Sequence, residues 1–391
     1  MREEIQNATT LVLKIGSSLL LTQADADTKI QGVDTQWLAA MASDIADARA
    51  KGQKIIVVTS GALALGCAKL GVHRQDLNLA QRQAASATGQ IELVRGWQDA
   101  LSQHQITSAQ VLLTAEDTEQ RRRYLNARQT LTALLDMGSI PIINENDTLA
   151  TQELRYGDND RLAARVAAMV SADCLVLFSD IDGLYTANPA QTAEAEFLEV
   201  VEEITPAISA MAGGSGSQHG SGGMVTKLQA GEIAQSSGCH MILASGRVLH
   251  PLKALADGAR STLFRAHANP MTARKNWIAS TLHPAGRAHL DAGAVRALAQ
   301  GNSLLPVGIQ HMEGVFERGD CLSLLAPDGE EIARGLSAYA SSEAHLIVGK
   351  DSDAIAALPE FAHYSFERTE MVHRDDLVLL TSPKTQGGTN E

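Results

Sequence analysis

A lysine and a glycine-serine turn follow the first apolar run of the sequence. Residues 10–13 suit a buried strand, and Lys14, Gly16 and two serines come directly after them. A glycine lets backbone N–H groups approach an anion, a hydroxyl donates a hydrogen bond to it, and an ammonium group neutralises its charge. An ordinary strand and turn is the commoner explanation of one such segment, so the phosphate-binding interpretation depends on the other strand ends.

Three further apolar runs also end in polar residues. In chain order these are Ser60 and Gly61 after residues 54–58, Asn144 and Asp147 after residues 139–143, and Ser179 and Asp180 after residues 174–178. Helical periodicity separates the runs, as in residues 34–52, where Asp34 is the expected N-cap. Alternating strands and helices predict a mostly parallel sheet with helices on both faces, which binds ligands at the carboxyl ends of its strands. We therefore expect the four polar strand ends to share one edge.

Lysines, glycines, hydroxyls and a carboxylate at one sheet edge predict a nucleotide site, with Lys227 as a second cation and Asp180 as the carboxylate. The sequence has no G-x-x-x-x-G-K-[ST] loop and no G-x-G-x-x-G between a strand and a helix, which excludes the P-loop and Rossmann classes. Asn144, Asp147, Asn159 and Asp160 suit a small zwitterion such as an amino acid, although one of them could equally cap a helix. None of the twelve histidines has the spacing of a zinc motif, and we assign none to catalysis.

Composition narrows the class of protein. The chain has 391 residues, of which 45% are hydrophobic, and a net charge of -13, which argues against non-specific binding to nucleic acid or to anionic membranes. Four widely spaced cysteines suggest neither a zinc cluster nor a disulfide framework. No apolar run approaches the roughly 20 residues of a membrane span, and the N-terminus is polar, so we expect a cytoplasmic protein.

The chain divides near residue 266. We predict an α/β domain over residues 1–265, a linker over 266–280, a small β-rich domain over 281–378 and a disordered tail over 379–391. The glycine-serine run 213–223 lies inside the first domain and leads into a helix, so we interpret it as a mobile lid.

Seven short motifs together resemble the amino-acid kinase family, and within it the branch that acts on glutamate. They are residues 12–17, 58–62, 125–128, 143–147, 157–160, 179–185 and 222–230, and the C-terminal segments 301–306 and 372–376 resemble the PUA domain of bacterial members. The resemblance covers nearly the whole chain. It implies an amino-acid-kinase sheet sandwiched by helices, a PUA-like domain, and ATP-dependent phosphorylation of the side-chain carboxylate of L-glutamate with Mg²⁺ bridging the ATP phosphates.

By the family pattern, Lys14 and Lys227 flank the transferring phosphoryl group and Asp160 holds both lysines in place. The residues implied for glutamate binding are Ser60, Asp147, Asn159 and Asn144. The residues implied for ATP binding are Lys14, Gly16, Gly61, Ser179, Asp180, Gly222, Gly223, Met224 and Lys227.

The resemblance also implies a place in proline biosynthesis, feedback inhibition by proline, association with the downstream γ-glutamyl phosphate reductase (glutamate-5-semialdehyde dehydrogenase), and a homodimer or homotetramer. One alternative is a family member acting on aspartate, acetylglutamate, carbamate or a nucleotide. The other is an RNA-binding protein, because PUA domains often bind RNA. The C-terminal 111 residues carry 16 acidic and 8 basic residues, which counts against RNA.

Overall fold

The structure is a computed structural model. It describes residues 3–23, 30–149, 159–192, 194–212, 223–273, 278, 283–361 and 370–380. The chain forms two compact units, Met1–Pro270 and Met271–Glu391, and each is described by itself. The predicted lid lies outside the described residues except for Gly223. Leu379, at the start of the predicted tail, still belongs to a strand, and the tail from residue 381 lies outside the described residues.

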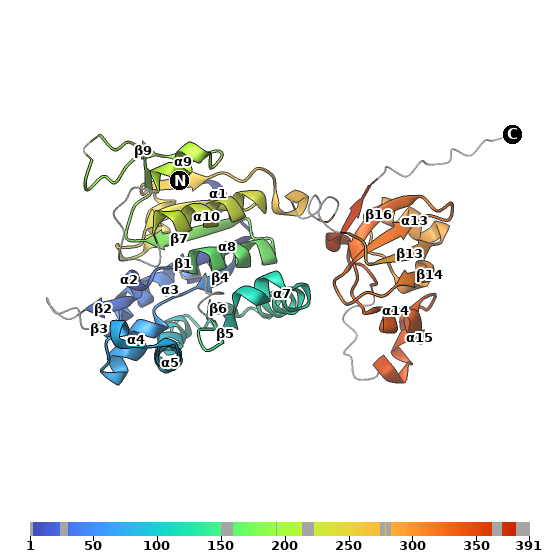
Figure 1. The fold of residues 1–391 in the computed structure, drawn as a ribbon, viewed down its shortest axis with the longest axis horizontal. Helices are drawn as coiled ribbons and strands as arrows, with labels where there is room; N and C mark the ends of the chain where they lie inside the picture. The colour runs from blue at the N-terminus through green and yellow to red at the C-terminus, as the bar shows by residue number, and fades with distance from the viewer. Residues whose placement is uncertain are drawn as a thin grey trace. The chain divides into compact units, whose positions relative to one another are not determined.

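An eight-stranded sheet forms the centre of the N-terminal unit (Figure 1). Its strands, in spatial order, are β10 (Val200–Val201), β12 (Ser261–Phe264), β11 (His240–Ser245), β7 (Cys174–Ser179), β1 (Thr10–Ile15), β4 (Lys54–Val58), β6 (Ile140–Glu145) and β5 (Ser108–Leu113). Only β11 and β12 pair antiparallel, and the other neighbours pair in parallel. The predicted mostly parallel α/β fold is confirmed.

Helices cover both faces of this sheet. One face packs against α3 (Thr35–Ala50), α4 (Ala62–Leu70), α5 (Leu79–Ser102) and α11 (Pro251–Ala256), and the other packs against α7 (Arg121–Asp136), α8 (Asn159–Val170) and α10 (Met224–Ser236). Strand alternation assigns the side chains of β1: Leu11, Leu13 and Ile15 enter the first layer, whereas Val12 enters the second. The smaller elements are α1 (Glu3–Gln6), α2 (Ser17–Leu20), α6 (Ala115–Glu119), α9 (Pro206–Met211), and the paired strands β2 (Leu21–Gln23) with β3 (Ile30–Val33) and β8 (Leu184–Tyr185) with β9 (Phe197–Leu198).

The cap of the first long helix lies where we expected it, whereas β6 and β7 continue into polar residues that we had placed after their ends, and in β7 this residue is Ser179. Asp34 caps α3 as predicted, since its carboxylate accepts a hydrogen bond of 2.9 Å from the N–H of Trp37. Strand β6, however, continues through Asn144 and Glu145, which we had placed after its end. Pairing explains the extension, because β5 lies beside β6 and continues the ladder to these two residues.

The C-terminal unit is built around a second sheet, and its β-rich character is confirmed. Its strands, in spatial order, are β14 (Ile309–Gly314), β13 (Gly286–Leu290), β15 (Cys321–Leu325), β16 (Glu331–Leu336) and β17 (Leu377–Leu379). The short helices α13 (Ala292–Ala299), α14 (Ser341–Ile347) and α15 (Ser352–Ala356) accompany it in the described residues. The unit has its own apolar core, which includes Leu290, Phe316 and Leu324.

The four cysteine side chains lie in the protein interior. Cys67, Cys174, Cys239 and Cys321 are all buried, which agrees with the predicted role of packing residues. Within the described residues, we find no helix with the length and apolar character needed to traverse a bilayer.

Candidate active site

Four polar strand ends meet at one edge of the large sheet. Strands β7, β1, β4 and β6 are consecutive neighbours and parallel, so their carboxyl ends lie side by side. This confirms the predicted common edge. It gathers residues from segments far apart in the sequence, from Lys14 to Ser179.

A carboxylate sits between two lysines at this edge. Lys14 follows Val12 on the same face of β1, which is the face covered by α8 and α10 (Figure 1). Asp160 begins α8, and Lys227 lies in the first turn of α10. One oxygen of Asp160 contacts the Nζ of Lys14, and the other accepts a hydrogen bond of 2.9 Å from the Nζ of Lys227. The Lys14–Asp160–Lys227 triad therefore links one strand and two helix starts.

The triad is buried. Lys14 is 5% exposed, Asp160 0% and Lys227 6%. Burial on its own raises the pKa of Asp160, but the charges of Lys14 and Lys227 more than offset burial and hold that pKa well below its ordinary value. Asp160 is therefore a carboxylate at any physiological pH, and the triad has two positive charges and one negative charge.

A chain of side-chain amides lies on the neighbouring strand ends. Asn159 donates a hydrogen bond of 2.7 Å to Asn144 and another to the backbone carbonyl of Thr59. Asn144 in turn donates one of 2.7 Å to Gln90 of α5. All three amides are buried. Sequence patterns indicated Asn144 and Asn159 but gave no signal for Gln90.

Two glycines bring α5 close enough for this contact. A Cβ atom on Gly66 of α4 would lie 1.7 Å from the carbonyl oxygen of Ala85, and one on Gly89 would lie 2.0 Å from that of Ala62. Any larger residue would force α4 and α5 apart. Because Gln90 follows Gly89 directly, this close helix contact determines how near the Gln90 amide comes to the sheet edge.

The two glycine turns at the edge have different geometry. Gly61 has φ +110°, a left-handed conformation that favours glycine, and it begins α4. Ser60 beside it donates a hydrogen bond of 3.1 Å to the carbonyl of Ile15, which ties β4 to β1. The N–H of Gly16 donates to the carbonyl of Phe178 at 3.3 Å, so this N–H is engaged within the sheet.

The other predicted residues occupy the rim of the same edge. Ser179 donates a hydrogen bond of 3.0 Å to the half-exposed Asp180, whose other oxygen lies 3.7 Å from Arg247. Asp147 is half-buried in the turn after β6. Gly223 is the N-cap of α10 and Met224 its first residue, whereas Gly222 lies outside the described residues.

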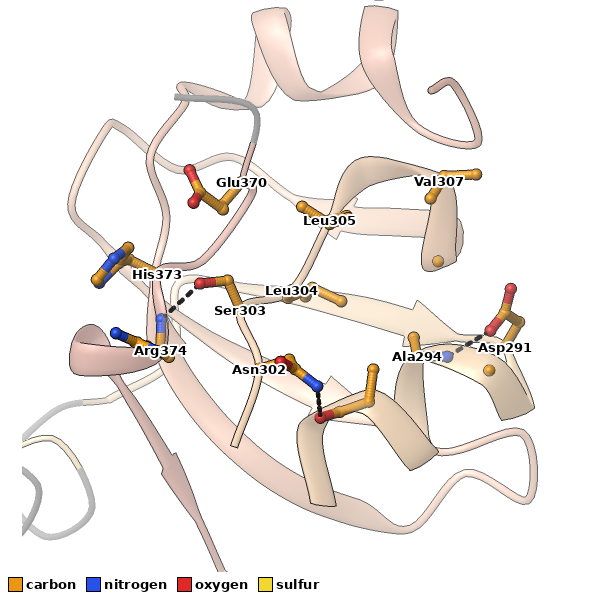
Figure 2. Close-up of a pocket in the computed structure, with 13 residues that line it drawn as sticks. Asp291, Ala294, Asn302, Ser303, Leu304, Leu305, Val307, Glu370, His373 and Arg374 are labelled. Carbon is orange, nitrogen blue, oxygen red and sulfur yellow. Dashed lines mark hydrogen bonds between the residues drawn. The ribbon is translucent and has the colours of Figure 1, made fainter. Parts of the chain in front are cut away.

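The C-terminal unit has a hollow of about 690 Å³ between α13 and the 3₁₀ turns that flank the β14 and β17 strands (Figure 2). Two carboxylates, Asp291 and Glu370, line it together with one guanidinium, Arg374, and the imidazole of His373. Positive charge is therefore not in excess there. In the N-terminal unit, Arg123 in the first turn of α7 lies 3.2 Å from Asp117.

A buried lysine pair around one carboxylate, at the carboxyl edge of a mostly parallel sheet, has the chemistry that suits an anionic ligand of the phosphate type. The model of the amino acid kinase family matches residues 9–245, and that of the PUA domain matches residues 286–358. The chain belongs to the amino acid kinase family, as its motifs predicted.

Relatives match over nearly the whole length. A protein of Paramagnetospirillum magneticum named glutamate 5-kinase is 55% identical over 372 residues, which are 95% of this chain and 98% of the relative. A protein of Rhizobium meliloti named glutamate 5-kinase 1 is 54% identical over 382 residues, which are 98% of this chain and 94% of the relative. A solved isopentenyl phosphate kinase aligns with a TM-score of 0.44 at 17% identity, over 65% of this chain and 99% of that one.

Proposed function

We propose that this chain transfers the γ-phosphoryl group of ATP to the side-chain carboxylate of L-glutamate, which yields γ-glutamyl 5-phosphate for proline biosynthesis. The observation that carries the proposal is the buried Lys14–Asp160–Lys227 triad. Family membership and the names of the full-length relatives support the choice of ATP and glutamate.

Transfer of a phosphoryl group to a carboxylate requires positively charged groups in the site rather than a general base. A glutamate side chain is already ionised at neutral pH, so no general base has to remove a proton. The obstacle is the approach of two anions, because each like-charge contact at about 4 Å costs about 4 kcal/mol at an effective dielectric constant of about 20. Preorganised positive groups lower this cost most when they are buried and need no rearrangement.

In the proposed mechanism, the two ammonium groups of the triad stabilise the charge on the phosphoryl group during transfer. Lys14 reaches it from the end of β1, and Lys227 reaches it from the first turn of α10. Asp160 touches neither substrate and acts as a positioning residue, because both of its oxygens lie against the lysines. Its charge keeps the two ammonium groups close together.

The amide chain and the strand-end carboxylate form the proposed glutamate pocket. Asn144 and Asn159 offer donors and acceptors to the α-carboxylate and ammonium of the substrate, and Asp147 faces the ammonium group. Ser60 completes the pocket beside Gly61. The proposed nucleotide side consists of Gly16, Gly61, Ser179, Asp180, Gly222, Gly223 and Met224.

We propose that Mg²⁺ enters with ATP. The donor set suits this assignment: Asp180 presents a half-exposed carboxylate next to the hydroxyl of Ser179, and oxygen donors are the ligands Mg²⁺ prefers. Asp160 does not suit a metal, since both of its oxygens lie against ammonium groups. When bound, Mg²⁺ neutralises part of the phosphate charge.

Hydroxylamine trapping tests the proposed reaction. An acyl phosphate reacts with hydroxylamine to give a hydroxamate, so the full-length protein with ATP, Mg²⁺ and L-glutamate should form γ-glutamyl hydroxamate. Aspartate, acetylglutamate, carbamate and nucleoside monophosphates serve as alternative acceptors in parallel reactions, and the formation of ADP is measured in all of them because a nucleoside monophosphate gives no acyl phosphate to trap. Faster product formation with one of them would reassign the substrate, and no product with any acceptor would overturn the proposal.

The finer proposals follow from the same family membership. Proline should compete with glutamate for its pocket, and proline added to the trapping assay should raise the KM for glutamate. The labile product favours association with its reductase, which co-purification tests. We also propose a homodimer or homotetramer, which sedimentation tests. Four buried and widely spaced cysteines suit a reducing compartment, so we propose the cytoplasm. Residues 266–280 remain our proposed linker, with the kinase domain before it and the PUA-like domain after it.

A further inference from the structure

A cluster of two histidines, a glutamate and an arginine lies on the outer face of the C-terminal sheet. Strands β13 and β14 pair antiparallel, with Arg287 opposite Glu313 and His289 opposite His311 (Figure 1). The residues between them, Ala288 and Met312, are buried, so alternation directs all four side chains to the opposite face. Cross-strand neighbours have Cβ atoms about 4.5–5.5 Å apart, which suits shared coordination of one ion.

The three ligand atoms already have the spacing of a coordination shell. The Oε1 atom of Glu313 lies 3.2 Å from the Nε2 atom of His289 and 3.6 Å from the Nε2 atom of His311. All three atoms lie within 4.8 Å of one another. A tetrahedral zinc ion with bonds of about 2.0–2.1 Å has neighbouring ligand atoms roughly 3.3 Å apart. The distances of 3.2 Å and 3.6 Å from Glu313 to the two histidines lie on either side of this value.

A neighbouring cation orients the carboxylate. The Nη1 atom of Arg287 lies 3.7 Å from the Oε2 atom of Glu313, so the other oxygen, Oε1, faces the histidines. Partners of this kind hold ligating carboxylates in place in metal sites. Glu313 therefore presents one oxygen to Arg287 and the other to both imidazoles.

The imidazoles have to rotate to bind an ion. Their rings are stacked, with centroids 3.8 Å apart and planes 13° from parallel. A metal must lie in the plane of each ring, so the stack has to open by rotation about the soft Cβ–Cγ bonds. His289 is 24% and His311 58% exposed at the side chain, which leaves room for this rotation.

We propose that His289, His311 and Glu313 bind a divalent transition-metal ion, of which Zn²⁺ is the best match. Imidazole nitrogen favours Zn²⁺ over Mg²⁺, so this ion differs from the one that accompanies ATP. Three protein ligands leave a fourth position for water or another ligand. Because β14 is the edge strand of its sheet, the bound ion joins that strand to β13.

Metal binding to the full-length protein tests the proposal. After chelator treatment and dialysis, we expect one Zn²⁺ per chain by equilibrium dialysis, with a dissociation constant in the micromolar range or below and no displacement by millimolar Mg²⁺. Co²⁺ in its place should show the visible absorption of a tetrahedral nitrogen and oxygen site. The variants are His311→Ala and Glu313→Gln, and the control is His345→Ala, which removes an exposed histidine of α14 in the same unit.

The proposal predicts at least tenfold weaker binding in His311→Ala and in Glu313→Gln, and unchanged binding in His345→Ala. Glu313→Gln keeps the size of the side chain, and an unchanged circular dichroism spectrum shows that the variant is folded. Equal affinity in all four proteins, displacement by Mg²⁺, or no Zn²⁺ bound to the wild type would each overturn the proposal. Trapping of γ-glutamyl hydroxamate is measured separately and should be unaffected.

Discussion

Replacing Asp160 by asparagine removes the only carboxylate contact shared by Lys14 and Lys227 in the described structure and keeps the size of the side chain. Two buried ammonium groups then face each other without that negative charge. Removing one partner of a buried ion pair costs about 3–5 kcal/mol. We therefore expect Asp160→Asn to lower the free energy of unfolding by about 3–5 kcal/mol in the absence of nucleotide, and to lower kcat because the lysines lose their position.

Urea unfolding followed by tryptophan fluorescence measures this change, since Trp37 and Trp97 are both buried in the N-terminal unit. The matched control is Asp136→Asn. Asp136 pairs with Lys54 at 2.7 Å, but the two side chains are 58% and 44% exposed. Exposed pairs contribute about 0–1 kcal/mol, so the control should lose at most that amount.

Adding ATP with Mg²⁺ provides a second arm of the experiment. The phosphates bring negative charge to the lysines, so the nucleotide should raise the unfolding midpoint of Asp160→Asn by more than that of the wild type. Two results would refute the reasoning. If the Asp160→Asn variant were as stable as Asp136→Asn, the buried lysines would not depend on the Asp160 carboxylate. If its kcat were undiminished, Asp160 would have no positioning role.

Five further substitutions probe the large sheet and the helices that pack on it. Lys14→Ala or Lys227→Ala should lower kcat by about 10²–10³-fold, equivalent to about 2.7–4 kcal/mol, and turnover at the wild-type rate would reject their roles. Asp147→Ala should raise the KM for glutamate far more than that for ATP, and equal effects would move Asp147 out of the pocket. Gln90→Met removes the acceptor of the buried Asn144 amide and should lower the free energy of unfolding in urea by about 1–3 kcal/mol. An unchanged free energy of unfolding would mean that this contact contributes nothing to stability. Burial lowers the pKa of His240 below its ordinary value of 6.5, so the unfolded chain binds the proton more tightly and stability should fall as the pH drops below 6.5. The pH dependence of the free energy of unfolding should be shallower in His240→Gln. Identical pH profiles would show that His240 does not cause this loss of stability.

The strands and their polar ends were predictable because both depend on local patterns. Apolar runs followed by Lys14, Ser60 or Ser179 are visible in the sequence, and the rules of parallel sheets bring such ends to one edge. The position of Asn144 was less accurate, since the ladder with β5 extends β6 beyond its apolar residues. Pairing between strands decides where a strand ends, and a single sequence does not reveal the partner.

Contacts between distant elements were not predictable from the residues alone. Gln90 lies in α5, and its contact with Asn144 depends on the close packing of α4 and α5 at Gly66 and Gly89. A glycine in a helix has several explanations, and only the packing partner distinguishes them.

The register of β1 connects the core to the chemistry. Leu11, Leu13 and Ile15 fill the layer of α3 and α5, which directs Val12 and Lys14 to the layer of α8 and α10. A shift by one residue would turn Lys14 away from Asp160 and Lys227 and would expose the apolar set to the wrong layer. The same apolar contacts that stabilise the strand therefore hold one of the two ammonium groups at the sheet edge. The two ammonium groups and one carboxylate of the triad together carry one unit of positive charge. Loss of Asp160 would leave the two ammonium groups buried together without its negative charge, whereas the net positive charge of the intact triad attracts a phosphate.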